Sequence, residues 1–269
     1  MIDTRRIAEH WGRERLAEAI FAALAAIGKD LDALTIDDLA ASDQFHGGGK
    51  PTTVRLARLA APAPGTRVLD VGGGLGGPAR TLAVEFGCDV TSLDLTESYV
   101  RAAETLTARL RLGDRVRHQV GNALELPFDD GAFDMVWTQN SGMNIENKER
   151  LYAGFHRVLR PGGRLALQEP MAGPKQPVFF PVMWARDAST NFLRPPDALR
   201  AVIEAAGFRV RQWDDVSAEA AGPESAADIP AHNIQRIVMG DALDAIRRAS
   251  DRNRAEGRIL LIQAVFDRP

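Results

Sequence analysis

The stretch VLDVGGGLGG, residues 68–77, decides the fold. A short apolar run that ends in a cluster of glycines is typical of a buried strand followed by a tight turn and a helix. Glycines at this point let the chain turn and bring backbone N–H groups against a ligand at the start of the helix. Gly72, Gly74 and Gly77 fit the GxGxxG pattern, and Asp94 follows Gly74 by about 20 residues, as in dinucleotide-binding domains. The pattern alone does not separate a nicotinamide enzyme from other users of such a loop.

Outward from this loop, strands alternate with helices. Apolar and β-branched runs predict seven strands, at 67–71, 89–94, 116–120, 133–137, 164–168, 209–213 and 258–266. Helical spacing predicts helices at 14–27, 79–85, 98–112, 148–159 and 196–206, and three glycines with a proline predict a loop at 43–53. This alternation predicts an α/β fold, a Rossmann-like, seven-stranded, mostly parallel sheet with helices on both faces.

The organisation along the chain indicates one domain over residues 1–269. Residues 1–50 are expected to hold N-terminal helices and a loop that covers the ligand, and residues 51–170 the ligand-binding core. Two insertions, 171–195 and 217–256, are predicted to form a lid over one end of the sheet. The second insertion ends in a predicted polar helix.

Composition narrows the classes of partner. The 33 Lys and Arg residues against 36 Asp and Glu give a formal net charge of -3, and no basic tract is present, so nucleic acid and anionic membranes are not expected partners. The single cysteine, Cys88, and five histidines without metal-ligand spacing predict no disulfide and no metal site. Without a signal peptide or an apolar span, the chain is expected to be cytoplasmic, as a monomer or homodimer.

Asp70 bears on the kind of ligand. A carboxylate two residues before the first glycine would repel a pyrophosphate, and it suits a cationic ligand group such as an ammonium. Alternatively, Asp70 only satisfies backbone N–H groups of the turn.

Four stretches together carry a family resemblance: LDVGGGLGGPA at 69–79, TSLDLTESYV at 91–100, GNALELPFDDGAFDMVWTQNSGMNI at 121–145 and HRVLRPGGRLALQEP at 156–170. In this order and spacing the chain resembles the class I S-adenosylmethionine-dependent methyltransferases, over about residues 43–213. The stretch DQFHGGG at 43–49 and the lid segments resemble the small-molecule branch that holds the sarcosine and dimethylglycine N-methyltransferases.

The resemblance implies S-adenosylmethionine as cofactor and S-adenosylhomocysteine as product. It places Asp70 near the amino group, Asp94 on both ribose hydroxyls, Leu95 over the adenine and Gln139 beside the sulfonium. It also places Gly72, Gly73 and Gly74 along the methionine and ribose, Asn122, Ala123 and Leu124 along the adenine edge, and Gln44, His46, Gly47 and Gly48 in a loop over the methionine carboxylate. The family commonly has aspartate at the position of Asn122, whose amide oxygen can still accept from the adenine amine.

Candidates for the acceptor side are fewer. Asn140, Met143 and Asn144 follow the fourth predicted strand and can orient an acceptor, and relatives often have histidine where Asn140 stands. His232 in the lid has an ordinary pKa suited to a catalytic base, or it simply faces solvent at a helix start. Phe179 and Trp184 are predicted to wall the substrate pocket, unless they form the core of the lid.

The sequence therefore predicts transfer of a methyl group from S-adenosylmethionine to a small-molecule acceptor. An amine nitrogen is preferred over an oxygen or carbon of a phenolic, quinol or secondary-metabolite acceptor. An NAD-dependent oxidoreductase is the distant alternative, because the glycine pattern also fits that class.

Overall fold

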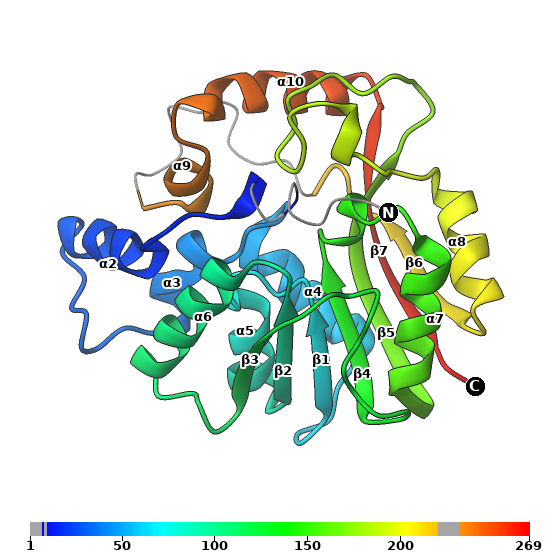
Figure 1. Cartoon of the computed structure of the whole chain (residues 1–269), viewed down its shortest axis with the longest axis horizontal. Coiled ribbons are helices and arrows are strands. Elements are labelled where there is room, and N and C mark those ends of the chain that lie inside the picture. Colours follow the sequence, from blue (N-terminus) through cyan, green and yellow to red (C-terminus); the bar gives the residue numbers. More distant parts are fainter. Residues whose placement is uncertain (1–6, 8–9, 220–231) are drawn as a thin grey trace.

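A computed structural model of the chain describes residue 7 and residues 10–219 and 232–269 (Figure 1). Its centre is a seven-stranded sheet in the order β3-β2-β1-β4-β5-β7-β6. Neighbouring strands are parallel, except that β7 runs antiparallel to β5 and β6. The strands are β1 (Arg67–Val71), β2 (Asp89–Asp94), β3 (Val116–Val120), β4 (Phe133–Gln139), β5 (Leu159–Ala172), β6 (Arg209–Asp215) and β7 (Ile259–Asp267). The predicted α/β fold is confirmed.

The central strands are apolar on both faces because helices cover both sides of the sheet. In β1, Leu69 joins an apolar cluster with residues of α7 and α8, and Val68 joins a second cluster with residues of α4 and α5. Successive side chains of a strand point to opposite faces, so one short strand serves both clusters. This packing fixes the carboxyl ends of β1, β2 and β4, where the candidate site lies.

The described helices are α2 (Leu16–Ala26), α3 (Ile36–Asp43), α4 (Gly49–Ala60), α5 (Gly77–Phe86), α6 (Glu97–Arg109), α7 (Lys148–Val158), α8 (Pro196–Ala205), α9 (Ile234–Met239) and α10 (Leu243–Ala255). The loop predicted at 43–53 is wrong at both ends, since α3 reaches Asp43 and α4 begins at Gly49. A capping box starts α3: Asp38 N donates to Thr35 Oγ1, and Thr35 N donates to Asp38 Oδ2.

Segments from both ends of the chain lie over the carboxyl ends of the strands. In Figure 1, α9, α10 and the segment between β5 and α8 lie above the sheet. Ile20, Leu39 and Ile246 belong to one apolar cluster that joins α2, α3 and α6 to α9 and α10. The described parts of the segments 171–195 and 217–256 lie at this end of the sheet, and their role as a lid stays a prediction; residues 220–231 are outside the described residues.

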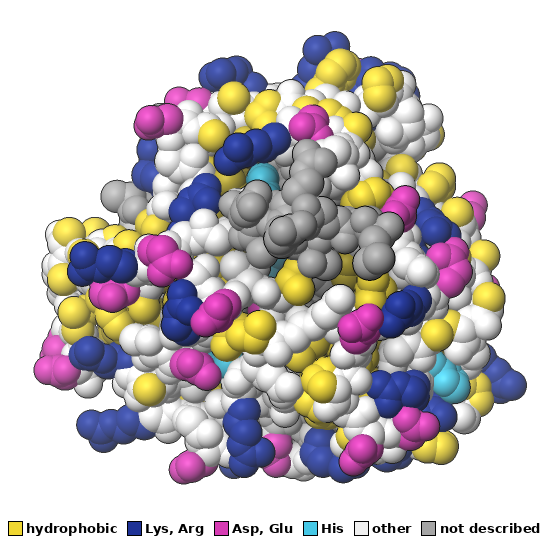
Figure 2. Space-filling model, viewed as in Figure 1, with side chains coloured by type: hydrophobic (Ala, Val, Ile, Leu, Met, Phe, Trp, Pro, Cys, Tyr) yellow, Lys and Arg dark blue, Asp and Glu magenta, His cyan; other side chains and the backbone are white. Residues whose placement is uncertain are grey.

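The surface carries both signs of charge. On the face in Figure 2, Lys and Arg side chains are interspersed with Asp and Glu, and hydrophobic side chains lie between them. No helix in the described ranges combines the length and the apolar character that crossing a bilayer requires.

Candidate functional site

Two cavities open over the strand ends and share a wall. The first is lined mainly by the segments 71–75, 93–96, 121–124 and 139–141, which follow β1, β2, β3 and β4. The second, of about 660 Å³, is lined by the loop 44–49, by Met143, Met183 and Trp184, and by parts of α10 and β7. Trp11, Phe45, His46 and Asn140 line both cavities. A ligand in each cavity would therefore meet the other at these four residues.

The glycine loop forms the floor of the first cavity. Gly72 has φ +74, and a Cβ there would lie 2.3 Å from Ser141 Cβ; a Cβ on Gly73 would lie 1.9 Å from Ser92 Oγ. The backbone N–H groups of Gly72 and Gly73 both donate to Leu93 O. The expectation that this loop turns its N–H groups toward a ligand is therefore wrong at these two glycines. A loop whose donors are used internally is a poor site for a pyrophosphate.

Asp94 lies at the end of β2 and lines the first cavity. Its Oδ2 accepts from Gly74 N at 2.9 Å and its Oδ1 from Thr96 N at 2.8 Å. Burial raises the pKa of Asp94, and the two backbone donors counteract that effect. Each oxygen keeps a lone pair for a further donor, which suits the predicted role toward two ribose hydroxyls.

Asn122 lies at the opposite end of the cavity, with Ala123 and Leu124 beside it. Its Oδ1 already accepts from Leu124 N at 2.9 Å. The resemblance implies that this oxygen accepts from the adenine amine, and in the structure Leu124 N is a further donor that shares it. Leu95 lines the same cavity, as the resemblance implies for a residue that covers the adenine.

Gln139 ends β4 at the junction of the cavities. Its Oε1 accepts from Trp137 Nε1 at 3.0 Å and from Thr53 Oγ1 at 3.1 Å. Its Nε2 is buried and has no hydrogen-bond partner within the described chain. A buried donor without a partner is unfavourable, and Nε2 is the hydrogen-bonding atom of Gln139 that stays unused beside the first cavity.

His46 is 8% exposed and lies in the shared wall. Its Nε2 lies 2.9 Å from Gln44 Oε1 and 3.0 Å from Thr53 Oγ1. Its Nδ1 lies 3.4 Å from Gln168 Nε2 and 3.3 Å from Gly47 O. Burial lowers the pKa of His46 to about 4, so the imidazole is neutral at physiological pH.

Two buried carboxylates lie near the glycine loop. Asp70 is 1% exposed, is absent from the walls of both cavities and lies behind Gly73, whose added Cβ would be 2.9 Å from Asp70 Oδ2. Burial and the charge of Asp94 raise the pKa of Asp70 to about 7. Asp43, which the sequence did not single out, does line the first cavity and pairs with Arg80, with 2.8 Å between Oδ2 and Nη2. The available signal was that Asp43 is the first residue of the DQFHGGG stretch.

The first cavity fits the cofactor that the resemblance implies. Glycines 72 and 73 leave no room for side chains behind the loop, while the carboxylate of Asp94 and the amide of Gln139 keep hydrogen-bonding capacity. These groups suit neutral hydroxyls and a zwitterionic amino acid better than a pyrophosphate.

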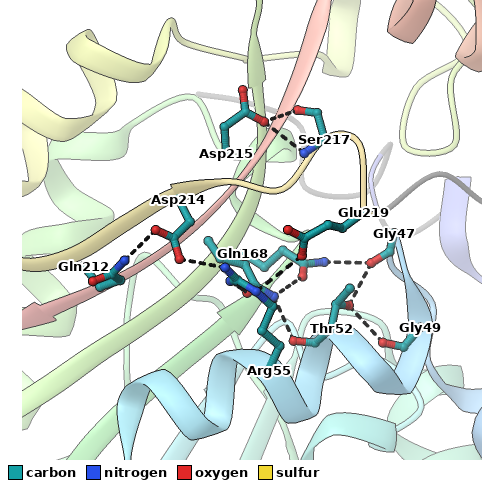
Figure 3. Close-up of polar contacts among 11 residues, drawn as sticks. Gly47, Gly49, Thr52, Arg55, Gln168, Gln212, Asp214, Asp215, Ser217 and Glu219 are labelled. Atoms are coloured by element: carbon teal, nitrogen blue, oxygen red, sulfur yellow. Dashed lines mark hydrogen bonds and ion pairs between the residues drawn. The ribbon is translucent and has the colours of Figure 1, made fainter.

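A chain of hydrogen bonds runs from Arg55, in the wall of the second cavity, through two buried amides to the shared wall; Figure 3 shows Arg55 and Gln168 of this chain. Arg55 Nη1 on α4 donates to Gln263 Oε1 at 2.5 Å, and Gln263 Nε2 donates to Gln168 Oε1 at 2.8 Å. Gln168 Nε2 then donates to Gly47 O at 3.1 Å and lies 3.3 Å from Asn140 Oδ1. Asn140 has φ +52, a conformation that few residues other than glycine adopt. The chain therefore holds the orientation of the Asn140 amide.

An ionic cluster closes the outer end of this chain. Arg55 Nη2 donates to Asp214 Oδ2 at 2.7 Å, and its Nε lies 3.4 Å from Glu219 Oε2 (Figure 3). Arg55 and Glu219 both line the second cavity.

The structure brings some predicted acceptor residues to the second cavity and not others. Met143, Trp184 and Asn140 line it. Asn144 lines the first cavity, and its Nδ2 donates to Trp184 O and Thr190 O.

Phe179 and His232 line neither cavity. The Phe179 ring packs against Arg252 and Arg258, whose guanidinium carbons lie 3.6 and 4.2 Å from the ring centroid. The carbonyl of His232 accepts from Ser42 Oγ at 2.6 Å, and its ring gives no wall to either cavity. These placements do not support the pocket-wall and base roles. In the ranges that the structure describes, no three His, Cys, Asp or Glu residues are grouped to hold a metal ion.

Comparison with known proteins also indicates a methyltransferase. Residues 69–167 match the methyltransferase domain family. Methyltransferase GfsG of Streptomyces halstedii is 29% identical over 76% of this chain and 74% of its own length. A sarcosine/dimethylglycine N-methyltransferase of Halorhodospira halochloris is 32% identical over 61% of this chain, which spans 59% of that protein. The structure of geranyl diphosphate C-methyltransferase from Streptomyces coelicolor A3(2) covers 99% of this chain, and 98% of that chain is covered, with a TM-score of 0.72 and 19% identity, a likeness of fold.

Proposed function

Because the chain belongs to the class I S-adenosylmethionine-dependent methyltransferases and methylates a small molecule, we propose that its acceptor atom is an amine nitrogen. The observation that carries this proposal is the composition of the shared wall. Of the four described residues that line both cavities, only His46 has a titratable side chain, and burial lowers its pKa to about 4.

A weakly basic wall favours one class of nucleophile. A hydroxyl must lose its proton before or during attack, which calls for a base with a pKa near the working pH. An amine in its neutral form already carries the lone pair that attacks, so positioning alone suffices. His46, neutral and hydrogen-bonded on both sides, can orient an amine but is a poor proton acceptor.

When bound, S-adenosylmethionine supplies a methyl group on a sulfonium; its bond to sulfur breaks as the bond to nitrogen forms, and the product is S-adenosylhomocysteine. Asp94, Asn122 and Gln139 would hold the ribose, the adenine and the methionine end. Asn140 and His46 would orient the acceptor, whose surplus proton leaves to water after transfer.

The second cavity suggests the shape of the amine. About 660 Å³ accommodates a molecule well above the size of an amino acid. Trp11, Phe45 and Trp184 supply aromatic faces, which favour an amine with an apolar or planar body.

One observation favours an oxygen acceptor as a second candidate. Gln168 donates toward Asn140 Oδ1, which leaves the Asn140 amide nitrogen as the group offered to the acceptor. A hydroxyl oxygen can accept that donor and keep a lone pair for attack, whereas an amine nitrogen has a single lone pair.

A labelled-methyl assay with paired acceptors separates the two candidates. Each pair shares a skeleton and differs only in carrying an amine or a hydroxyl. We expect the amine member to be methylated, with kcat/KM rising with pH according to the acceptor's own ammonium pKa. Methylation of only the hydroxyl members would contradict the proposal.

His232→Ala and His46→Gln complete this test. His232→Ala should keep its rate, because His232 lies outside both cavity walls; a loss of about 100-fold or more with normal S-adenosylhomocysteine binding would restore the base predicted from sequence. His46→Gln should turn over more slowly with an unchanged pH profile. Loss of a limb from that profile would indicate that His46 acts as a base.

A further inference from the structure

The turn between β4 and α7, residues 140–145, contributes to the walls of both cavities. Asn140 lines both of them, Met143 lines the second and Asn144 lines the first. The turn leaves the sheet at Asn140, whose backbone N–H donates to Gln168 O on β5 at 2.8 Å. Beyond this point the backbone of the turn no longer follows the sheet, so other groups must fix its course.

Glu169, the residue after Gln168 on β5, binds the N–H groups of this turn. Its Oε1 accepts from Gly142 N at 2.9 Å and from Ser141 N at 3.3 Å. The residue is 2% exposed and lines neither cavity. A Cβ on Gly142 would lie 3.0 Å from Oε1, so a side chain at this position would press on the carboxylate. The turn and the carboxylate are therefore fitted closely to each other.

Lys148, the first residue of α7, binds the carbonyl groups of the same turn. Its Nζ donates to Gly142 O and, at 2.6 Å, to Ile145 O. The residue is 2% exposed and also lines neither cavity. Burial lowers the pKa of Lys148 to about 8, although the charge of Glu169 raises it, and an ammonium at a helix N-terminus opposes the helix dipole. Lys148 is therefore unfavourable for the helix that carries it, and its hydrogen bonds hold the turn instead.

Two buried charges on one turn contribute little to stability. Replacing buried charges by uncharged groups of similar volume is often neutral for stability, whereas the geometry that the charges impose is lost. Here the carboxylate binds the N–H and the ammonium binds the carbonyl of the same residue, Gly142, which fixes the backbone of the turn from both sides. The side chain of Asn140, two residues earlier, takes its direction from this backbone. A displacement of about 1 Å in a group that orients a reactant can lower a rate about 100-fold.

We propose that Glu169 and Lys148 are positioning residues for methyl transfer, which hold the turn 140–145 so that Asn140 and Met143 keep their places in the wall that faces the acceptor. Both act through the backbone of the turn and not by touching a ligand. This role rests on the proposed contact of Asn140 with the acceptor, and it holds for a nitrogen or an oxygen acceptor alike.

Steady-state kinetics of the full chain test this role. The acceptor is the member of the amine and hydroxyl pairs that the wild-type protein methylates fastest, and kcat is divided by the number of S-adenosylhomocysteine sites counted by calorimetry, so unfolded protein is not included. The double variant Glu169→Gln/Lys148→Met removes both charges at similar volume. Its kcat per site should fall by about 10- to 100-fold, with the acceptor KM and the S-adenosylhomocysteine Kd within about 3-fold of wild type. Glu149→Gln is the matched control: it breaks an ion pair with Arg194 at the next position of α7 and should keep kcat within about 2-fold.

Amide hydrogen exchange adds a measurement that needs no acceptor. The N–H groups of residues 141 and 142 should exchange at least about 10-fold faster in the double variant, while those of β1 keep their rates. Equal exchange at 141 and 142 would overturn the proposed hold on the turn. Faster exchange with an unchanged kcat per site, or a rise in KM without a fall in kcat, would overturn the positioning role.

A second variant covers the case in which the double variant does not fold. Gly142→Ala places a Cβ 3.0 Å from Glu169 Oε1 and leaves both charges in the chain. It should give the same selective loss of kcat per site, and a normal kcat per site would overturn the proposal. Failure of the amine proposal appears separately, as methylation of only the hydroxyl members, and the same kinetic test then runs on those acceptors.

Discussion

The two cavities that meet at His46 and Asn140 are built in different ways. The first takes most of its wall from short segments that directly follow β1, β2, β3 and β4. The second draws on α4, the segment after β4, Trp184 and residues of α10 and β7, which lie far apart in the sequence. The hydrogen-bonded sheet fixes the positions of the strand ends. The wall of the second cavity, in contrast, forms only when segments that are distant in the sequence pack together. The difference predicts that substitutions have larger effects in the first cavity than in the second.

Gly72→Ala should give the largest effect. The new Cβ would lie 2.3 Å from Ser141 Cβ, in a backbone conformation that alanine rarely adopts. We expect S-adenosylhomocysteine binding to fall by about 1000-fold or beyond detection in calorimetry, with the fold retained by circular dichroism. Gly113→Ala is the control, since an added Cβ there meets no atom within 4 Å. Normal binding by Gly72→Ala would show that the loop is less rigid than the sheet beneath it.

Asp94→Ala should give the second-largest effect. Removing the carboxylate takes away the predicted ribose contacts and the acceptor for the Gly74 and Thr96 N–H groups. Affinity for S-adenosylhomocysteine should fall by about 1.5 to 3 kcal/mol, as for charge-assisted hydrogen bonds, and Asp94→Asn should lose less. Unchanged affinity in a calorimetric titration would remove Asp94 from the cofactor site.

His46→Gln should change the pH dependence of stability. The unfolded chain holds His46 near its ordinary pKa of 6.5 and the folded chain near 4, so the unfolded state binds more protons between these values. The stability that His46 contributes is present above pH 6.5 and is lost as pH falls toward 4, by about 2 kcal/mol at pH 5. Urea denaturation at pH 7 and pH 5 should show a drop smaller by about this amount in the variant. An equal drop would mean that His46 is hydrated in the folded protein.

Trp184→Phe should have the smallest effect, and this effect should be limited to the second cavity. The change shortens an aromatic wall and removes the hydrogen bond from Nε1 to Asn191 Oδ1. The acceptor KM should rise by about 3- to 10-fold, with S-adenosylhomocysteine affinity unchanged. A matching loss of S-adenosylhomocysteine affinity would show that the two cavities are energetically one.

Most residues of the first cavity could be predicted from the sequence, whereas many residues of the second could not, and the reason is physical. β2 and β3 were predicted residue for residue, because apolar runs bounded by turns are local signals. The four segments after the strands followed from them, with Asp94 and Gln139 among their residues. Asp43 was missed because its partner, Arg80, is 37 residues away and their contact exists only in the folded chain.

The same limit explains the misplaced acceptor residues. Phe179 and Trp184 are five residues apart and both aromatic, yet Phe179 packs against Arg252 and Arg258 whereas Trp184 lines the second cavity. Nothing in their local sequence separates them. The prediction of a loop over 43–53 was wrong for another reason. Gly48 and Gly49 begin α4, and the Thr35–Asp38 capping box is a local signal for α3.

Asn140 shows how this site would respond to selection in the laboratory. Its left-handed backbone conformation is one that glycine adopts more readily, so a library sorted only for heat resistance would tolerate or enrich glycine at this position. A library sorted for turnover would keep asparagine, because glycine leaves Gln168 without the amide it orients and the acceptor without a donor. At position 140, directed evolution for heat resistance is thus expected to select glycine, whereas directed evolution for activity is expected to keep asparagine.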